Sequence, residues 1–159
     1  MGVDTNLYNL VLVLHILAVI IGFGGLFISS FYGAEGARRQ GREGLVITET
    51  AFKVTRLAPT MAIYSVPILG ILLILLSDDQ WKFSQAWVSL SFLLYIVLLV
   101  LAITVQVPTT RKVIALRSGS EGVRTTEMEA AARTAAMVGG IINVLWVVVL
   151  ILMVFKPGA

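Results

Sequence analysis

Apolar residues in the chain gather into four long runs, which charged segments separate from one another. The runs lie at about residues 7–32, 60–76, 86–107 and 135–155, and the second is the shortest. A helix needs about 17 to 25 apolar residues to cross the hydrocarbon core of a bilayer. Within lipid the backbone must satisfy its own hydrogen bonds, which favours helices in all four runs. With their flanks, the runs predict transmembrane helices at about residues 7–32, 57–77, 84–107 and 127–155.

The segments between the runs predict how these helices connect. The link SDDQWKFSQ is short, so the second and third helices must form an antiparallel hairpin. We therefore expect a single all-α transmembrane domain over residues 1–159, an up-down-up-down bundle of four helices. Residues 33–56 and 108–126 are the expected cytoplasmic loops. We predict a mobile turn in GAEGARRQGREG, helical extensions in LVITETAFKVTRLA and TRKVIALR, and a capping box at Thr126–Glu129.

Composition and charge agree with a membrane protein and indicate its orientation. Hydrophobic residues make up 58% of the chain and charged residues only 13%, which excludes an ordinary soluble domain. Of the twelve Lys and Arg residues, all but Lys82 and Lys156 lie in the two expected cytoplasmic segments or just beside them. The positive-inside rule then places both termini outside the cytoplasm. The net charge of +3 suits anionic lipid head groups, and we predict no nucleic-acid partner.

The N-terminal segment and the lack of cysteine exclude two further features. MGVDTNLYN carries an acid and no base, unlike the start of a signal peptide, so we expect the first helix to remain in the mature protein. The chain has no cysteine, which excludes disulfides and thiolate metal sites.

Small residues recur on one face of the first helix and of the last helix. Such stripes let helix backbones approach closely in lipid, so the simplest interpretation is that the first and last helices pack along them. The stripes, which we predict as packing residues, are Ala18, Gly22, Gly25 and Ser29 on the first helix and Ala136 and Gly140 on the last.

Polar side chains should meet near the middle of the membrane. His15 is the chain's single histidine and lies deep in the first run. Residues at the same expected depth are Tyr64, Ser91, Tyr95, Asn143 and Trp146, and together with His15 we call these the midplane residues. Because polar groups facing lipid are costly, all six should point inward. Pro67 also leaves the carbonyl of Ile63 without its helical donor, which adds an acceptor at this level.

The midplane residues allow a structural and a functional interpretation. They form either a hydrogen-bonded cluster that fixes helix register, with His15 neutral, or a site in which His15 ligates haem iron or relays protons. In the second case Tyr64, Tyr95, Asn143 and Trp146 would surround the cofactor, haem b being the candidate. The chain has no second histidine, so a symmetric dimer, a Tyr or a Met could supply the other ligand. Met61, Met128 and Met137 lie toward the cytoplasmic side and Met153 near the outer end of its helix, so the sequence does not complete a coordination sphere.

Short motifs along the chain resemble a known family. They are LHILAVIIGFGGLF in the first helix, Arg56 and Pro59 at the start of the second, Trp87 at the start of the third, and the closing LMVFKP. They resemble a family of small bacterial membrane proteins, domain of unknown function 2269. The first helix and the closing Lys-Pro are also similar to HemJ-type protoporphyrinogen oxidases and, more loosely, to CopD copper-resistance proteins. The HemJ resemblance implies haem on His15, and the family resemblance implies the bacterial inner membrane.

Three functions are consistent with the sequence. The first, which we favour, is a non-enzymatic membrane protein that self-associates or serves as an accessory subunit of a larger complex. The second is a haem-binding redox protein with His15 as ligand. The third is a small transporter or metal-handling protein, although the spans contain no paired carboxylates. The motifs of soluble enzymes are missing, including a phosphate-binding loop and a nucleophile elbow.

Overall fold

The computed structural model describes residues 2–39, 41–119, 123 and 125–158. They form helices and no strand. The elements are α1 (Asn6–Arg38), α2 (Gly41–Arg56), α3 (Ala58–Leu76), α4 (Ala86–Leu101), the π-helical segment η1 (Ala102–Gln106), α5 (Val107–Gly119) and α6 (Thr126–Phe155).

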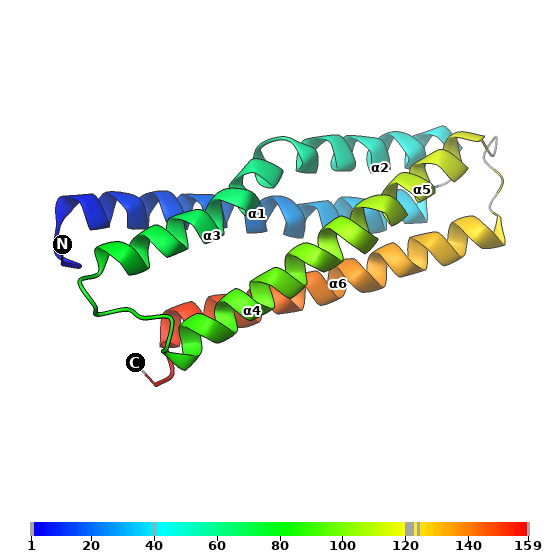
Figure 1. Ribbon diagram of the computed structural model, residues 1–159. Coiled ribbons are helices and arrows are strands. Elements are labelled where there is room, and N and C mark those ends of the chain that lie inside the picture. Colours follow the sequence, from blue (N-terminus) through cyan, green and yellow to red (C-terminus); the bar gives the residue numbers. More distant parts are fainter. Residues whose placement is uncertain (1, 40, 120–122, 124, 159) are drawn as a thin grey trace.

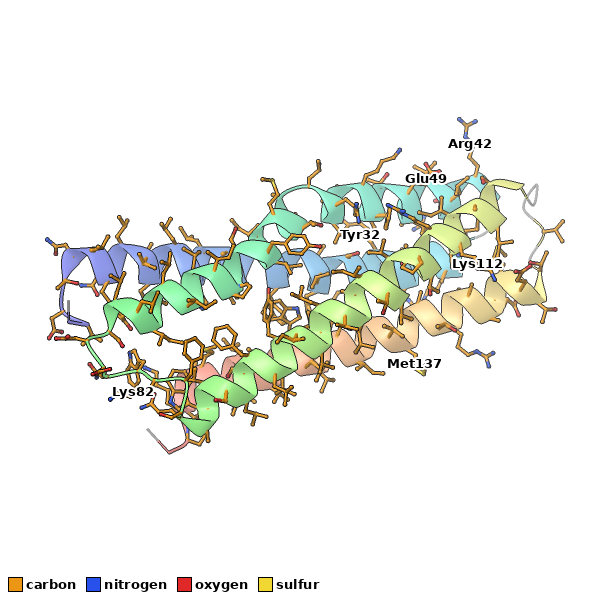
Figure 2. The ribbon with its side chains drawn as sticks, in the orientation of Figure 1. Tyr32, Arg42, Glu49, Lys82, Lys112 and Met137 are labelled. Carbon is orange, nitrogen blue, oxygen red and sulfur yellow. The ribbon has the colours of Figure 1, made fainter. Side chains whose placement is uncertain are left out.

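Four helical stretches are long and apolar enough to cross a membrane, which confirms the predicted fold class. They are residues 6–38, 41–76, 86–119 and 126–155. Figure 1 shows α1 beside α3 and α4 beside α6, with both termini and the 77–85 link at one end. We call this the terminal end. The opposite end, where α1 turns into α2, is the basic end. Figure 2 shows Arg42 and Lys112 there and Lys82 at the terminal end.

The turn between α1 and α2 is much shorter than predicted. Instead of a mobile turn over residues 33–44, α1 continues to Arg38 and α2 begins at Gly41, whose φ of +60° suits a glycine. The neighbouring glycines allow close packing instead of flexibility. A Cβ on Gly44 would lie 2.7 Å from the carbonyl oxygen of Gly36, so the backbones of α1 and α2 are in direct contact here.

Arg117 of α5 bonds to the region where α1 and α2 meet. One terminal nitrogen of its guanidinium donates to the carbonyl oxygens of Gly36 (2.6 Å) and Gly44 (2.9 Å). It also donates to the hydroxyl of Thr48 at 2.9 Å. A single cation therefore joins α5 to both α1 and α2.

Prolines interrupt two of the four membrane-length stretches. Leu57, with φ −86° and ψ −118°, separates α2 from α3, and Pro59 lies in the first turn of α3. Pro108 lacks an N–H and follows η1, in which the N–H of Val107 reaches back to the carbonyl of Ala102. The helical extension predicted at TRKVIALR is confirmed as part of α5.

The start of α6 differs from the prediction by one residue. The helix cap is Thr125, whose hydroxyl accepts from the N–H of Met128 at 3.2 Å. The capping box predicted at Thr126–Glu129 is therefore wrong, because the preceding threonine occupies the extended cap position and Thr126 is already helical.

The two glycines of the α1 stripe, Gly22 and Gly25, pack against α3 and not against α6. A Cβ on Gly22 would lie 3.0 Å from the side chain of Ile63, and a Cβ on Gly25 would lie 2.6 Å from the Cβ of Pro59. Ala136 and Gly140 on α6 are exposed, and a Cβ on Gly140 would have no neighbour within 4 Å. The predicted seam between these two stripes does not form, because the bulk of Ile63 and Pro59 fits the groove on α1 instead. Of the remaining stripe residues, Ala18 is buried and Ser29 half-buried.

The hydrophobic core lies where the two helix pairs meet. It brings together residues of α1, α3, α4 and α6, and Leu98 is completely buried in it. The core residues are Ala18, Ile63, Val66, Tyr95, Leu98, Val138, Ile142 and Trp146.

Candidate functional site: a cavity in the terminal half

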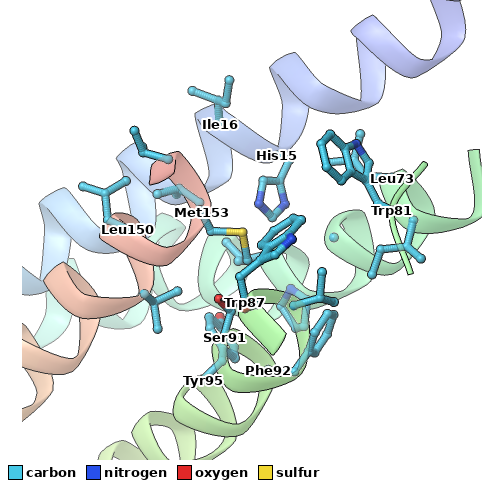
Figure 3. A pocket seen from close by; sticks show the side chains of 18 of the residues that line it. His15, Ile16, Leu73, Trp81, Trp87, Ser91, Phe92, Tyr95, Leu150 and Met153 are labelled. Carbon is cyan, nitrogen blue, oxygen red and sulfur yellow. Dashed lines mark hydrogen bonds between the residues drawn. The ribbon is translucent and has the colours of Figure 1, made fainter. Parts of the chain in front are cut away.

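A cavity of about 310 Å³ lies between the α1–α3 pair and the α4–α6 pair, on the terminal side of the core. Side chains from all four helices and from the 77–85 link form its wall, and most of them are apolar or aromatic (Figure 3). This volume lies at the small end of the range found for ligand pockets in proteins.

His15 projects from α1 into this cavity. In Figure 3 its ring points toward Met153 of α6 and Trp87 of α4. On the other side the ring contacts α3 at Gly70, where a Cβ would lie 3.5 Å from the His15 Cε1. The Nδ1 atom is shielded from solvent, and no described residue meets hydrogen-bond geometry with it, although the backbone of Val66 on α3 lies close to the ring. An imidazole in this state retains a polar group that a ligand can use.

Tyr95 of α4 uses the carbonyl that Pro67 sets free. Its hydroxyl donates to the carbonyl oxygen of Ile63, four residues before Pro67 on α3. The predicted extra acceptor is therefore confirmed. Ser91, one turn earlier on α4, is also buried, and its hydroxyl donates to the carbonyl of Trp87 at 2.6 Å.

All three tryptophans of the chain line the cavity. The indole N–H of Trp81 donates to the hydroxyl of Tyr8 at 3.0 Å. Trp87 is 6% exposed and Trp146 is 2% exposed, and their indole nitrogens have no partner among the described residues. A buried donor without a partner lowers the free energy of unfolding by about 1 to 3 kcal/mol. Two such donors lie at this one cavity.

Lys156 lies at the terminal mouth of the cavity. Its ammonium is 4.0 Å from the centre of the Trp81 ring and 5.8 Å from that of Trp87, within the range of a cation–π contact. Its backbone adopts a left-handed conformation at the end of α6. That conformation ends α6 directly beside the cavity.

Four of the six midplane residues line the cavity, and two do not. His15, Ser91, Tyr95 and Trp146 are in its wall. Tyr64 follows buried Ile63 on α3 and is 49% exposed, because successive helical residues point about 100° apart. Asn143 instead donates to the hydroxyl of Ser30 on α1 at 3.0 Å. The predicted inward orientation of Tyr64 is therefore wrong, and Asn143 lies outside the cavity.

Sequence reasoning missed Trp87, Met153 and Lys156 as cavity residues. In the sequence Trp87 marks only the start of a helix, and Met153 lies near the outer end of its helix. A signal was present, because Trp87, Ser91 and Tyr95 are four residues apart and share a helix face. Trp146, Met153 and Lys156 are spaced seven and three residues apart, which also places them on one face.

Comparisons with known proteins identify a family and nothing finer. A family model described as "Predicted integral membrane protein (DUF2269)" matches residues 9–157. No curated protein and no solved structure matches the chain. The resemblance to HemJ-type and CopD-type proteins therefore stays an expectation.

Proposed function

Since the chain belongs to the DUF2269 family of predicted integral membrane proteins, we propose that it binds a small lipid-soluble molecule in the cavity of its terminal half. The observation that carries this proposal is the pair of unpaired buried indole nitrogens of Trp87 and Trp146 at one cavity, which His15 also lines. They come from two different helices, so local helix geometry does not explain them together. A ligand that bonds to these groups offsets the cost of burying them.

Extraction of the purified protein tests this proposal. Gly70→Leu fills the space beside His15 and Phe92, whose Cζ would lie 3.8 Å from a Cβ at this position. Gly70→Ala, which adds only ordinary contacts, is the matched control. We expect mass spectrometry of solvent extracts to find a lipid-soluble molecule with the wild type and Gly70→Ala, and its loss in Gly70→Leu. Identical extracts from all three proteins contradict the proposal.

Haem is a second candidate because Met153 lines the same cavity as His15. A histidine nitrogen and a methionine sulfur are an established pair of axial haem ligands. The two donors suit haem iron, which would supply one-electron chemistry when bound, but a cavity of about 310 Å³ would have to widen to take the whole macrocycle. In that case we expect a Soret band that His15→Ala removes and Met153→Leu shifts. Met137→Leu, on an exposed part of α6, is the control and leaves the band unchanged. A colourless wild-type protein contradicts this candidate.

We also propose that the terminal end faces away from the cytoplasm of a bacterial inner membrane. Support comes from the charge distribution, since α2 and α5 at the basic end carry six of the twelve Lys and Arg residues, and Arg38 and Arg39 lie at the same end of α1. The same reasoning places the cavity in the outer half of the bilayer.

Self-association, or assembly into a larger membrane complex, is proposed through α6. Ala136 and Gly140 are small, four residues apart and exposed, as in helices that associate closely in lipid. We expect detergent-corrected light scattering to give more than one copy per particle, and Gly140→Leu to reduce the number. Gly24→Leu is the control, because Gly24 also has open space beside it but lies on α1. A monomeric wild type contradicts self-association.

A further inference from the structure

The polar groups of the cavity restrict which ligand it can hold. The hydroxyls of Ser91 and Tyr95 already donate to backbone carbonyls. Two indole N–H groups, of Trp87 and Trp146, remain without a partner among the described residues, and an indole N–H only donates. Lys156 at the mouth adds further donors. The missing partner must therefore offer hydrogen-bond acceptors.

The walls favour a flat ring. Tyr95 and Trp146 meet edge to face at 5.4 Å between ring centres, and Trp81 and Trp87 do so at 5.5 Å. Phe92 adds a further ring to the wall. Aromatic walls of this kind stack on planar conjugated ligands. A ligand with acceptors at its edges and aromatic faces matches both features.

The size of the cavity suits a head group and not a whole lipid. At about 310 Å³ it has room for one or two fused rings, but a long tail must leave it. Part of the wall reaches the outer surface of the bundle at Ile16, Leu150 and Val154, which are 47%, 47% and 67% exposed. These residues belong to α1 and α6, so an apolar tail leaving between them would enter the surrounding lipid.

We propose that the ligand is a lipid-soluble quinone, with its ring in the cavity and its two carbonyl oxygens accepting from the indole N–H groups of Trp87 and Trp146. This inference rests on the proposed ligand-binding function and names its ligand class. A quinone has two acceptors, no donor, a flat ring and a tail, which together match the four properties of the site. A phospholipid or fatty acid fits less well, because neither has a flat ring to place against the aromatic wall.

Equilibrium dialysis of the detergent-solubilised protein tests the quinone directly. The probes are 2-methyl-1,4-naphthoquinone and 2-methylnaphthalene, which differ only in the two carbonyl groups. Gly70→Leu measures the background from the micelle. We expect the naphthoquinone to bind with at least about fivefold higher affinity, since each new hydrogen bond contributes roughly 0.5 to 1.5 kcal/mol. Equal binding of both probes overturns the quinone assignment.

Tryptophan variants locate the bonds. Trp87→Phe and Trp146→Phe keep a ring but remove the donor, and each should weaken naphthoquinone binding by about two- to tenfold while leaving 2-methylnaphthalene binding unchanged. Trp81→Phe is the matched control, because its N–H already has Tyr8 as partner, and naphthoquinone affinity should be unchanged. Equal losses in all three variants, or none, overturn the proposed bonds.

The two proposals fail in different ways. If neither probe binds above the Gly70→Leu background, and the extracts of wild type and Gly70→Leu also agree, the cavity binds no ligand and both proposals are wrong. If 2-methylnaphthalene binds as well as the quinone, or a different molecule is extracted and lost in Gly70→Leu, only the quinone assignment is overturned.

Discussion

Single residues determine how closely the helices approach one another, and Gly25 shows this most clearly. Gly25→Ala should lower thermal stability in detergent by about 1 to 3 kcal/mol, because the added methyl overlaps the ring of Pro59 on α3. Gly24→Ala, one position away, meets nothing within 4 Å and is the control. A melting temperature unchanged in Gly25→Ala would show that α1 and α3 do not pack at this distance.

The hydroxyl of Tyr95 and the ring of Pro67 form a pair that a double substitution can separate. Tyr95→Phe should destabilise the protein by about 1 to 3 kcal/mol, because it leaves the Ile63 carbonyl buried without a donor. Adding Pro67→Ala restores a helical N–H to that carbonyl and should recover part of the loss. Thermal unfolding measures both effects.

Tyr64→Phe is the control for this pair, since Tyr64 is about half exposed on the same helix. Its melting temperature should remain at the wild-type value. If Pro67→Ala lowers stability equally with and without Tyr95→Phe, the two residues act independently and the proposed pairing is wrong.

At this scale the sequence predicted less of the site than of the fold. The depth of His15, Tyr95 and Trp146 followed from counting along their helices. The direction of Tyr64 did not, because α3 is apolar on every side and offers no periodicity from which to read its buried face. The packing of Gly22 against Ile63 and of Gly25 against Pro59 fixes the rotation of α3.

Among the elements, α2 is joined to α5 by the hydrogen bonds of a single side chain, Arg117. Arg117→Ala removes the hydrogen bonds that α5 makes to Gly36, Gly44 and Thr48. Hydrogen exchange of the amides of α2 should then accelerate by about ten- to hundredfold, since bonds from a charged donor contribute about 1.5 to 3 kcal/mol. Arg133→Ala, an exposed arginine on α6, should leave exchange unchanged. Equal exchange rates in both variants would show that the hydrogen bonds of Arg117 do not stabilise α2.

The sequence predicted the helices well where length and hydrophobicity determine the structure. It predicted them poorly at the turn between α1 and α2, where glycines determine it. Glycines at 33, 36, 41 and 44 indicate a flexible turn when they are considered by composition alone. In the structure Gly41 makes the turn, while Gly36 and Gly44 bring two helices together. A glycine that makes a turn differs from one that allows close packing in whether another helix backbone lies against it. The local sequence does not contain that information.

For the whole molecule, the lack of cysteine makes the orientation directly measurable. Ser84→Cys places one thiol at an exposed position of the 77–85 link, and Ser118→Cys places one at an exposed position near the end of α5. In intact cells or spheroplasts, a membrane-impermeant maleimide should label the first at once and the second only after permeabilisation. The reverse pattern would place both termini in the cytoplasm and move the cavity to the inner half of the bilayer.

The overall architecture was predictable because four apolar runs with short links leave few arrangements. What the chain did not predict is that its polar groups gather around a cavity instead of bonding to one another. The cavity forms because the α1–α3 pair and the α4–α6 pair lie farther apart toward the terminal end, as Figure 1 shows. How far apart they lie depends on packing throughout the bundle.

Helix α1 is long enough to extend beyond the membrane into the water at the basic end. Its 33 residues extend for about 50 Å, against a hydrocarbon core of about 30 Å. The surplus amounts to several turns, and α2 and α5 flank these turns on the same side. A soluble protein approaching from that side would first touch a rigid helical platform raised above the lipid head groups.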